Sequence, residues 1–131
     1  MDKSETYIKM AGKAEEIQNK WKPEIYDSYV ERSNIRIIPD ISTRIHLNNR
    51  FKFDVVYMWL PRQDQLQELL NYSIAPLGIT WKFFWSVYGD AEDDKNREYW
   101  SVFNSMEQLW LAFVMKEKFN KIWTGKEWKE Q

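Results

Sequence analysis

The chain has 131 residues, a length that suits one domain with a sizeable buried core. Its 19 Lys and Arg residues against 20 Asp and Glu residues leave a net charge of −1, which argues against a strongly basic nucleic-acid clamp or a polybasic membrane anchor. The lack of cysteine excludes disulfides, thiol nucleophiles and Cys-ligated zinc, and no stretch approaches the roughly 18 apolar residues of a membrane span. Aromatic residues make up 17% of the chain, and eight of them are tryptophans.

A first helix is predicted over residues 4–22. Its apolar side chains recur at spacings of three and four, which places them on one stripe of a helix. Ser4 can accept a hydrogen bond at the start, and Pro23 ends the helix because the residue before a proline avoids the helical region. The stripe consists of Tyr7, Met10, Ala14, Ile17 and Trp21.

Between residues 24 and 60 the apolar period changes toward two, which indicates strands. A short strand is predicted around residues 35–41 with a break near Pro39, and residues 25–30 are a further candidate. Residues 43–47 and 50–59 flank an Asn-Asn pair that suits a tight turn, so they are predicted to form a hairpin.

Two helices are predicted between residues 61 and 88. Pro61 suits the first position of one of them, whose buried side is formed by Leu66, Leu69 and Leu70. The other is expected over residues 77–88 and ends at a glycine. Residues 89–98 are then predicted to form an acidic loop, and residues 99–103 a short aromatic strand.

The last third of the chain begins with a capping box, in which Gln108 follows Ser105 by three residues. The helix after it is apolar over much of its circumference, so we expect it to be the central, most buried helix. Residues 119–131 are expected to form a hairpin-like tail that turns at Thr124-Gly125. The whole chain, residues 1–131, is therefore predicted to be a single α+β domain with about four helices beside a small antiparallel sheet.

Residues suited to catalysis or metal binding are few. His46 is the only histidine, and we expect an ordinary strand residue there rather than a metal ligand. The acidic residues 90–94 lack the EF-hand spacing and favour a solvated loop over a cation site. Asp54 and Asp64 could act as acid and base only if the fold brought them together. Because nucleophile elbows and phosphate-binding glycine loops are also missing, we expect no enzyme activity, no metal and no cofactor.

Aromatic residues alternate with basic ones at two places, which is a pattern used by single-stranded nucleic-acid binders. Phe51, Lys52 and Phe53 provide one such place, and Lys126 in the tail belongs to the other. The net charge argues against this function, because backbone binding depends on cations. The other interpretation is that the rings face the core and the lysines face water.

Protein binding fits the composition better, because a large ring left partly exposed makes a natural interface anchor. Trp123 and Trp128 lie in a charged tail and are the tryptophans we expect to be exposed, while Tyr99 and Trp100 adjoin the acidic stretch that could engage a basic partner. The alternative is that these tryptophans pin the tail onto the body of the domain.

Three blocks of the sequence resemble a family of small uncharacterised proteins of bacteriophages and prophages of Firmicutes. They are YIKM, AEEIQ and WKP within residues 7–23, WLPRQDQLQELL at residues 59–70, and SMEQLWLAFVM at residues 105–115 with KIWTGKEW at residues 121–128. The resemblance covers about half of the chain and implies a phage-type accessory protein in the bacterial cytoplasm. It transfers no catalytic or binding residue.

The sequence thus predicts a non-enzymatic accessory protein that binds and modulates a host or phage protein, with inhibition of host defence as one form of that modulation. The alternative is a single-stranded nucleic-acid-binding module.

Overall fold

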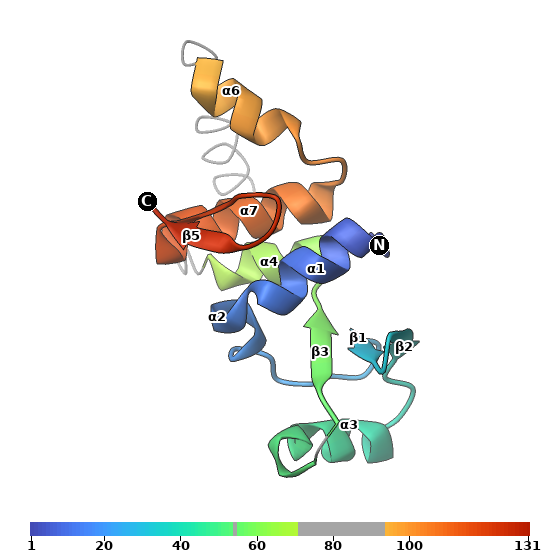
Figure 1. Cartoon of the computed structure of the whole chain (residues 1–131). Coiled ribbons are helices and arrows are strands. Elements are labelled where there is room, and N and C mark those ends of the chain that lie inside the picture. The colour runs from blue at the N-terminus through green and yellow to red at the C-terminus, as the bar shows by residue number, and fades with distance from the viewer. Residues whose placement is uncertain (54, 71–93) are drawn as a thin grey trace.

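The computed structural model describes residues 1–53, 55–70 and 94–131. In these residues six α-helices, one 310 helix and five strands form a mixed α+β fold, which confirms the predicted fold class (Figure 1). The strands make one three-stranded and one two-stranded antiparallel sheet. Within the described ranges, every helix is too short or too polar to cross a bilayer.

The predicted first helix is interrupted at Ala14. Helix α1 (Glu5–Lys13) begins at Ser4, whose hydroxyl accepts a hydrogen bond from the Tyr7 N–H at 3.2 Å, as predicted. Ala14 has a ψ of 73°, outside the helical region, so a separate short helix, α2 (Glu15–Gln18), follows. The predicted stripe is nevertheless buried throughout, at Tyr7, Met10, Ala14, Ile17 and Trp21.

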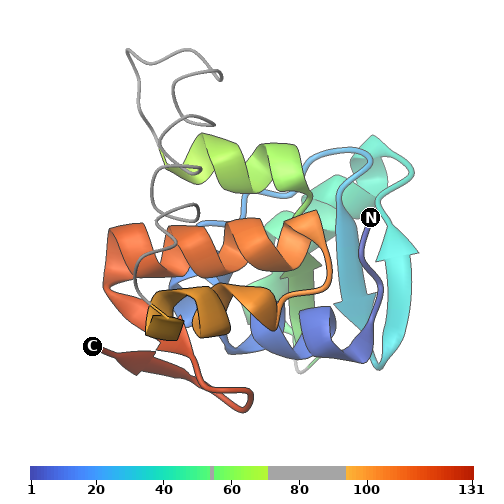
Figure 2. The ribbon, with the colours of Figure 1, turned by 90° about the horizontal axis from the view of Figure 1, so that it is seen from above.

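Helix α7 (Met106–Phe119) is the central helix, since it contacts α1, α4 and the C-terminal strand β4 (Figures 1 and 2). The Ser105 hydroxyl accepts a hydrogen bond from the Gln108 N–H at 3.1 Å, which is half of the predicted capping box. The Gln108 side chain reaches the N–H of Asn104 instead of that of Ser105, at 3.0 Å. Six consecutive residues of α7 are buried, namely Trp110, Leu111, Ala112, Phe113, Val114 and Met115.

Helix α4 (Gln63–Leu69) packs along α7 and buries Leu66 as predicted. Pro61 does not take the first helical position, because Arg62 is the N-cap residue and has an extended backbone. The Pro61 carbonyl instead accepts a hydrogen bond from the Tyr7 hydroxyl at 2.5 Å. This bond ties the start of α4 to α1.

The three-stranded sheet has the order β2-β1-β3 and consists of β1 (Ser28–Glu31), β2 (Asn34–Ile37) and β3 (Tyr57–Leu60). Both predicted short strands before residue 40 are therefore present, although they begin or end a few residues from the expected positions. Arg32 and Ser33 connect β1 to β2 with φ values of 47° and 69°. Two successive left-handed residues are the signature of the tight turn that suits the twist of a hairpin.

The hairpin predicted over residues 43–59 is wrong. Residues 41–48 form helix α3 (Ile41–Asn48), and a 310 helix, η1 (Arg50–Lys52), follows it, so β3 covers only the end of the predicted second strand. The reason lies at Asp40, whose carboxylate accepts a hydrogen bond from the Thr43 N–H at 2.8 Å and caps a helix. The two asparagines after position 47 end α3 instead of turning a hairpin.

The predictions of a loop up to residue 98 and a strand over residues 99–103 are also wrong, because helix α6 (Asp94–Ser101) occupies most of this stretch. The helix lets the ring of Trp100 face α7, where it lies 6.4 Å from the ring of Phe113. A strand would alternate its aromatic side chains between two faces. The predicted helix 77–88 and the acidic residues 89–93 lie outside the described residues.

The predicted C-terminal hairpin is confirmed, with strands β4 (Lys121–Trp123) and β5 (Trp128–Glu130). Gly125 in the turn has a φ of 92°, a value that side chains disfavour. The hairpin is docked on the body, since the Trp128 indole N–H donates a hydrogen bond to the Met10 carbonyl at 2.9 Å.

Candidate functional site

The tryptophans predicted to be exposed are buried. Trp123 is 7% exposed and Trp128 9%, so the prediction of exposed aromatic anchors in the tail is wrong. Trp100, predicted to contact a partner beside the acidic stretch, is 1% exposed. Trp123 and Trp128 face each other across the hairpin with ring centroids 5.0 Å apart, and both belong to the main hydrophobic core. Their packing corresponds to the alternative left open by the sequence, in which they hold the tail on the body.

Tyr99 and Trp123, which are 24 residues apart, do meet in the structure. The Trp123 N–H donates a hydrogen bond to the Tyr99 hydroxyl oxygen at 3.1 Å, and both residues line a cavity of about 320 Å³ together with Phe103 and Gly125. Burial raises the pKa of Tyr99 to about 12, so its phenol stays neutral. No charged side chain among the described residues lines this cavity, and it therefore offers no acid–base chemistry.

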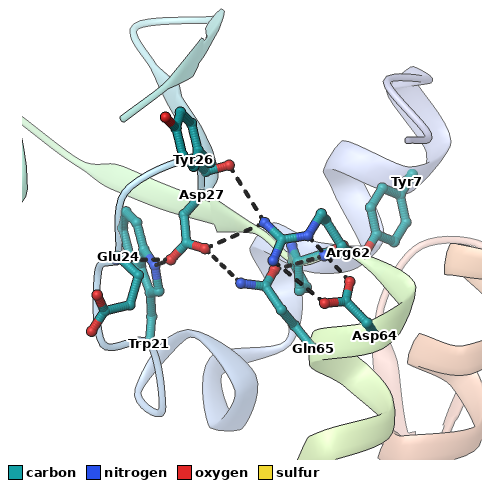
Figure 3. Close-up of polar contacts among 9 residues, drawn as sticks. Tyr7, Trp21, Glu24, Tyr26, Asp27, Arg62, Asp64 and Gln65 are labelled. Carbon is teal, nitrogen blue, oxygen red and sulfur yellow. Dashed lines mark hydrogen bonds and ion pairs between the residues drawn. The ribbon is translucent and has the colours of Figure 1, made fainter. Parts of the chain in front are cut away.

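A highly connected polar cluster surrounds Asp27, a buried residue that sequence reasoning missed (Figure 3). Its carboxylate accepts hydrogen bonds from the Trp21 indole N–H at 3.1 Å, the Glu24 N–H at 3.0 Å and the Gln65 amide at 2.5 Å. The Arg62 guanidinium lies 3.6 Å from the same carboxylate. With this many partners the carboxylate has no free position for a substrate, so the cluster joins the start of β1 to the start of α4.

Neither of the carboxylates proposed as an acid–base pair is supported by geometry. The Asp64 side chain pairs with Arg62 at 3.1 Å and points toward it (Figure 3). Asp54 lies outside the described residues. Tyr7 is deeply buried, and burial raises the pKa of its phenol well above the usual value, so it acts as a hydrogen-bond donor and not as a base.

His46 lies on α3 and not in a strand as predicted. Its ring is exposed, lies 4.4 Å from the Phe53 ring in a stacked arrangement, and has its Nε2 atom 3.0 Å from the Tyr57 hydroxyl. The described residues contain no group of three or more potential metal ligands. The histidine is thus part of a small aromatic cluster.

The largest concentration of exposed apolar side chains lies on α3 and the segment that follows it. Of nine strongly exposed large apolar side chains in the described residues, five fall between positions 41 and 56. Phe51, the most exposed of the aromatic ones, has 78% of its surface accessible. We call this set, which is defined by its place in the chain, the α3 surface, and it consists of Ile41, Ile45, Phe51, Phe53 and Val56. Val56 at its far end lines a hollow with Val30, Arg32 and Met58.

Helix α3 is attached to the body mainly by polar contacts, and Leu47 is its one buried residue. The Arg44 guanidinium pairs with Glu24 at 3.2 Å. Ile41 and Ile45 are four residues apart and therefore lie on one face of the helix. An amphipathic helix that packs on its own domain would normally bury such a pair.

A cation lies beneath the α3 surface. The Arg50 guanidinium sits between two rings, 4.9 Å from the centroid of Trp21 and 4.5 Å from that of Phe51. It donates hydrogen bonds to the Trp21 carbonyl at 2.9 Å and to the Leu47 carbonyl at 3.4 Å, and no carboxylate of the described residues forms an ion pair with it. Lys52 beside it is exposed, so the α3 surface is apolar with positive charge at its margin.

The four residues predicted for nucleic-acid binding do not form one surface. Phe51, Lys52 and Phe53 are exposed as that function requires, but they lie in or next to a 310 helix and not on a strand. Lys126 is exposed in the turn of the C-terminal hairpin, which lies on the other side of α1 from α3 (Figure 1).

Comparison with known proteins yields no match to a protein-family model, a curated protein or a solved structure.

Proposed function

We propose that this chain is a non-enzymatic accessory protein of phage or prophage type that binds a host or phage protein in the bacterial cytoplasm and modulates it. Inhibition of a host defence system is one form that this modulation would take. The observation that carries the proposal is the α3 surface, which gathers five large apolar side chains that the protein leaves in water.

The proposal rests on the cost of exposing apolar area. Transfer of apolar surface out of water is worth about 25 cal/mol per Å², so a cluster of exposed isoleucine and phenylalanine side chains offers substantial binding energy to a partner. Clustered apolar patches of this kind mark interaction sites, whereas isolated exposed residues need no explanation. Phe51 is suited to act as an anchor because the Arg50 guanidinium supports one face of its ring.

The non-enzymatic part of the proposal is supported by the partners of two acidic side chains. Asp27 is saturated with donors, and Asp64 is paired with Arg62. Asp27 therefore has a structural role, and Asp64 has a cation and not a second carboxylate as its neighbour.

The test is affinity capture of the tagged protein from nuclease-treated bacterial lysate, read by quantitative mass spectrometry. We expect Ile45→Ser and Phe51→Ser to reduce recovery of the same partner at least about tenfold, the range found for anchor residues. Val102→Ser is the matched control, because Val102 is 58% exposed but lies at the end of α6, away from the α3 surface. Capture that is unchanged by both α3 variants, or lost equally in the control, contradicts the proposal.

Single-stranded nucleic acid is a second candidate, favoured by the exposed Phe51 ring, which the Arg50 guanidinium contacts, and by the exposed Lys52 next to it in the chain. Binding of an oligothymidylate that weakens steeply with salt and with Lys52→Ala would support this function. Lys126→Ala should have no effect, because Lys126 lies in the turn between β4 and β5 and not in the α3 surface.

A further inference from the structure

The outer edge of the three-stranded sheet carries a second interaction surface. Strand β2 is the outermost strand, with β1 on its inner side (Figure 2). Its residues are largely exposed, and no strand of the described residues pairs with its outer side. An open edge presents a row of backbone donors and acceptors that can pair with another chain.

The hydrogen bonds of Gln18 establish which backbone groups point outward. The Trp59 N–H donates to the Gln18 side-chain oxygen at 2.7 Å, and the Gln18 amide donates to the Trp59 carbonyl at 2.9 Å. The backbone groups of Trp59 thus point away from β1, so the opposed pair Tyr29 and Trp59 is not hydrogen-bonded. Tyr29 must then bond to Arg36 on β2, because backbone groups alternate in direction along a strand.

A second set of bonds gives the same alternation. The Ile38 N–H donates to the Asp27 carbonyl at 3.0 Å, two residues along both strands from the pair formed by Tyr29 and Arg36. Arg36 and Ile38 therefore face β1, and the N–H and C=O groups of Ile35 and Ile37 face outward. Among the described residues no hydrogen-bond partner is found for these outward groups.

The two edges of the sheet thus differ in whether their outward backbone groups already have hydrogen-bond partners. At β3 the Gln18 side chain occupies the backbone groups of Trp59 and blocks strand addition there. At β2 the edge is open, and 54% of the Ile37 side chain is exposed beside it. We propose that β2 accepts an extended segment of a protein partner as a fourth strand.

Charge defines the chemistry of that segment. The Arg36 Nε atom pairs with Glu31 at 2.9 Å, and 54% of the Arg36 side chain is exposed. An acidic residue opposite Arg36 would pair with this exposed guanidinium, and apolar residues on either side of it would lie beside Ile35 and Ile37. The favoured partner segment therefore alternates apolar, acidic and apolar residues.

A second copy of this chain is a poorer occupant. In the antiparallel register that places Ile35 opposite Ile37 of the other copy, Arg36 directly faces Arg36, and like charges opposed across a strand pair destabilise it. In the registers that place Ile35 opposite Ile35 or Ile37 opposite Ile37, Arg36 faces Asn34 or Ile38, and neither supplies a carboxylate. The edge therefore favours a partner of different sequence that carries an acidic residue at this position.

This inference rests on the proposed function only in taking the partner to be a protein, and it uses residues outside the α3 surface. The probe is a synthetic peptide with the central sequence Thr-Val-Glu-Val-Thr, compared with the same peptide carrying Lys in place of Glu. We expect the glutamate peptide to slow hydrogen exchange of the Ile35 and Ile37 amides at least about tenfold at saturation, because strand addition forms main-chain hydrogen bonds to these groups. The lysine peptide should bind at least about fivefold more weakly.

Charge reversal provides the decisive variant. Arg36→Glu should invert the preference, so that the lysine peptide binds more tightly, whereas Arg32→Glu in the adjacent turn should leave it unchanged. Three results would overturn the proposal. The peptide could leave hydrogen exchange of the Ile35 and Ile37 amides unchanged. An oligothymidylate could slow their exchange instead, or their exchange could slow as the protein concentration rises without any peptide, which would indicate pairing of two copies. If the peptide slowed hydrogen exchange at Ile41 and Ile45 instead, the proposal would also be overturned, and the α3 surface would be supported as the protein-binding site. Failure of the peptide to bind leaves the lysate test of the α3 surface unaffected, so the two proposals fail separately.

Discussion

Asp27 is the residue at which the segment before β1 meets the start of α4. Its partners are the indole of Trp21, the backbone at Glu24 and the side chains of Gln65 and Arg62 (Figure 3). A buried carboxylate is tolerated only when its hydrogen-bonding capacity is filled, and here donors from the chain before and after the sheet fill it. Asp27 is therefore a structural residue of the body.

Asp27→Ala should destabilise the protein by about 3 kcal/mol, because it leaves buried donors without an acceptor. Urea unfolding followed by tryptophan fluorescence measures this difference. Asp64→Ala is the control, because Asp64 contacts the same Arg62 from an exposed position and should change stability by less than about 0.5 kcal/mol. Equal effects of the two substitutions would contradict the structural role of Asp27.

Asp2 links the starts of two helices. Its carboxylate accepts hydrogen bonds from the Ser4 N–H at 2.8 Å, the Ser105 hydroxyl at 2.5 Å and the Gln108 amide at 2.8 Å. Partial burial alone would raise the pKa of Asp2, but the hydrogen bonds to Ser105, Ser4 and Gln108 outweigh it and hold the pKa below the ordinary value. The folded state therefore favours the ionised form.

This shift predicts a pH dependence of stability. A carboxyl group whose pKa is lower in the folded state stabilises the protein above its unfolded pKa of about 4, and that contribution is lost as the pH falls through the lowered folded pKa. We expect Asp2→Asn to be less stable than the wild type at neutral pH, with the difference shrinking in acid. Chemical unfolding of both proteins across this range measures it, and a difference independent of pH would contradict the assignment.

At the scale of elements, α3 is notable because Ile41 and Ile45, one turn apart, are both more than half exposed. It depends on its cap, in which the Asp40 carboxylate accepts the Thr43 N–H, and on polar contacts of Arg44 and His46. The backbone and side-chain hydrogen bonds of Thr43 lower the pKa of Asp40, so the capping form is the charged one. An element held this way can open locally without unfolding the core.

Asp40→Ala should accelerate hydrogen exchange of the α3 amides while leaving α7 unchanged, because α7 is capped separately by Ser105. The same acceleration is expected in the wild type as the pH falls through the lowered pKa of Asp40, after correction for intrinsic exchange. Nuclear magnetic resonance exchange measurements resolve both helices. Unchanged exchange in α3 would show that the cap does not hold it.

At the scale of the whole molecule, the C-terminal hairpin is bound to the N-terminal helices. The Trp128 indole bonds the Met10 carbonyl, and Lys121 pairs with Glu16. The two ends of the chain therefore stabilise each other across more than 100 residues, as the contact between Trp128 and Met10 spans 118 positions.

Trp128→Ala should destabilise the fold by about 4 kcal/mol, since it removes a buried ring and its hydrogen bond. Thermal and urea unfolding check this, with Lys126→Ala in the same turn as the control, for which we expect almost no change. If Trp128→Ala folded with wild-type stability, the hairpin would not be part of the core.

The sequence alone determined those features that depend on neighbours along the chain. The stripe from Tyr7 to Trp21, the Ser4 and Ser105 caps, the apolar helix α7 and the glycine turn of the tail all follow from periodicity and local hydrogen bonding, and all are present. The alternation over residues 43–59 misled because a short helix with a good cap can carry the same apolar residues as a strand.

Only the tertiary structure decided which side chains face water. The tryptophans expected on the surface are buried because α1 and α7 supply an apolar face for the hairpin, whereas the isoleucines and phenylalanines of the α3 surface have no such neighbour among the described residues. The Asp27 cluster and the open β2 edge likewise depend on residues brought together from distant positions. Local patterns set what each segment can form, but exposure is a property of how the segments pack, and so the candidate binding surfaces appear only in the fold.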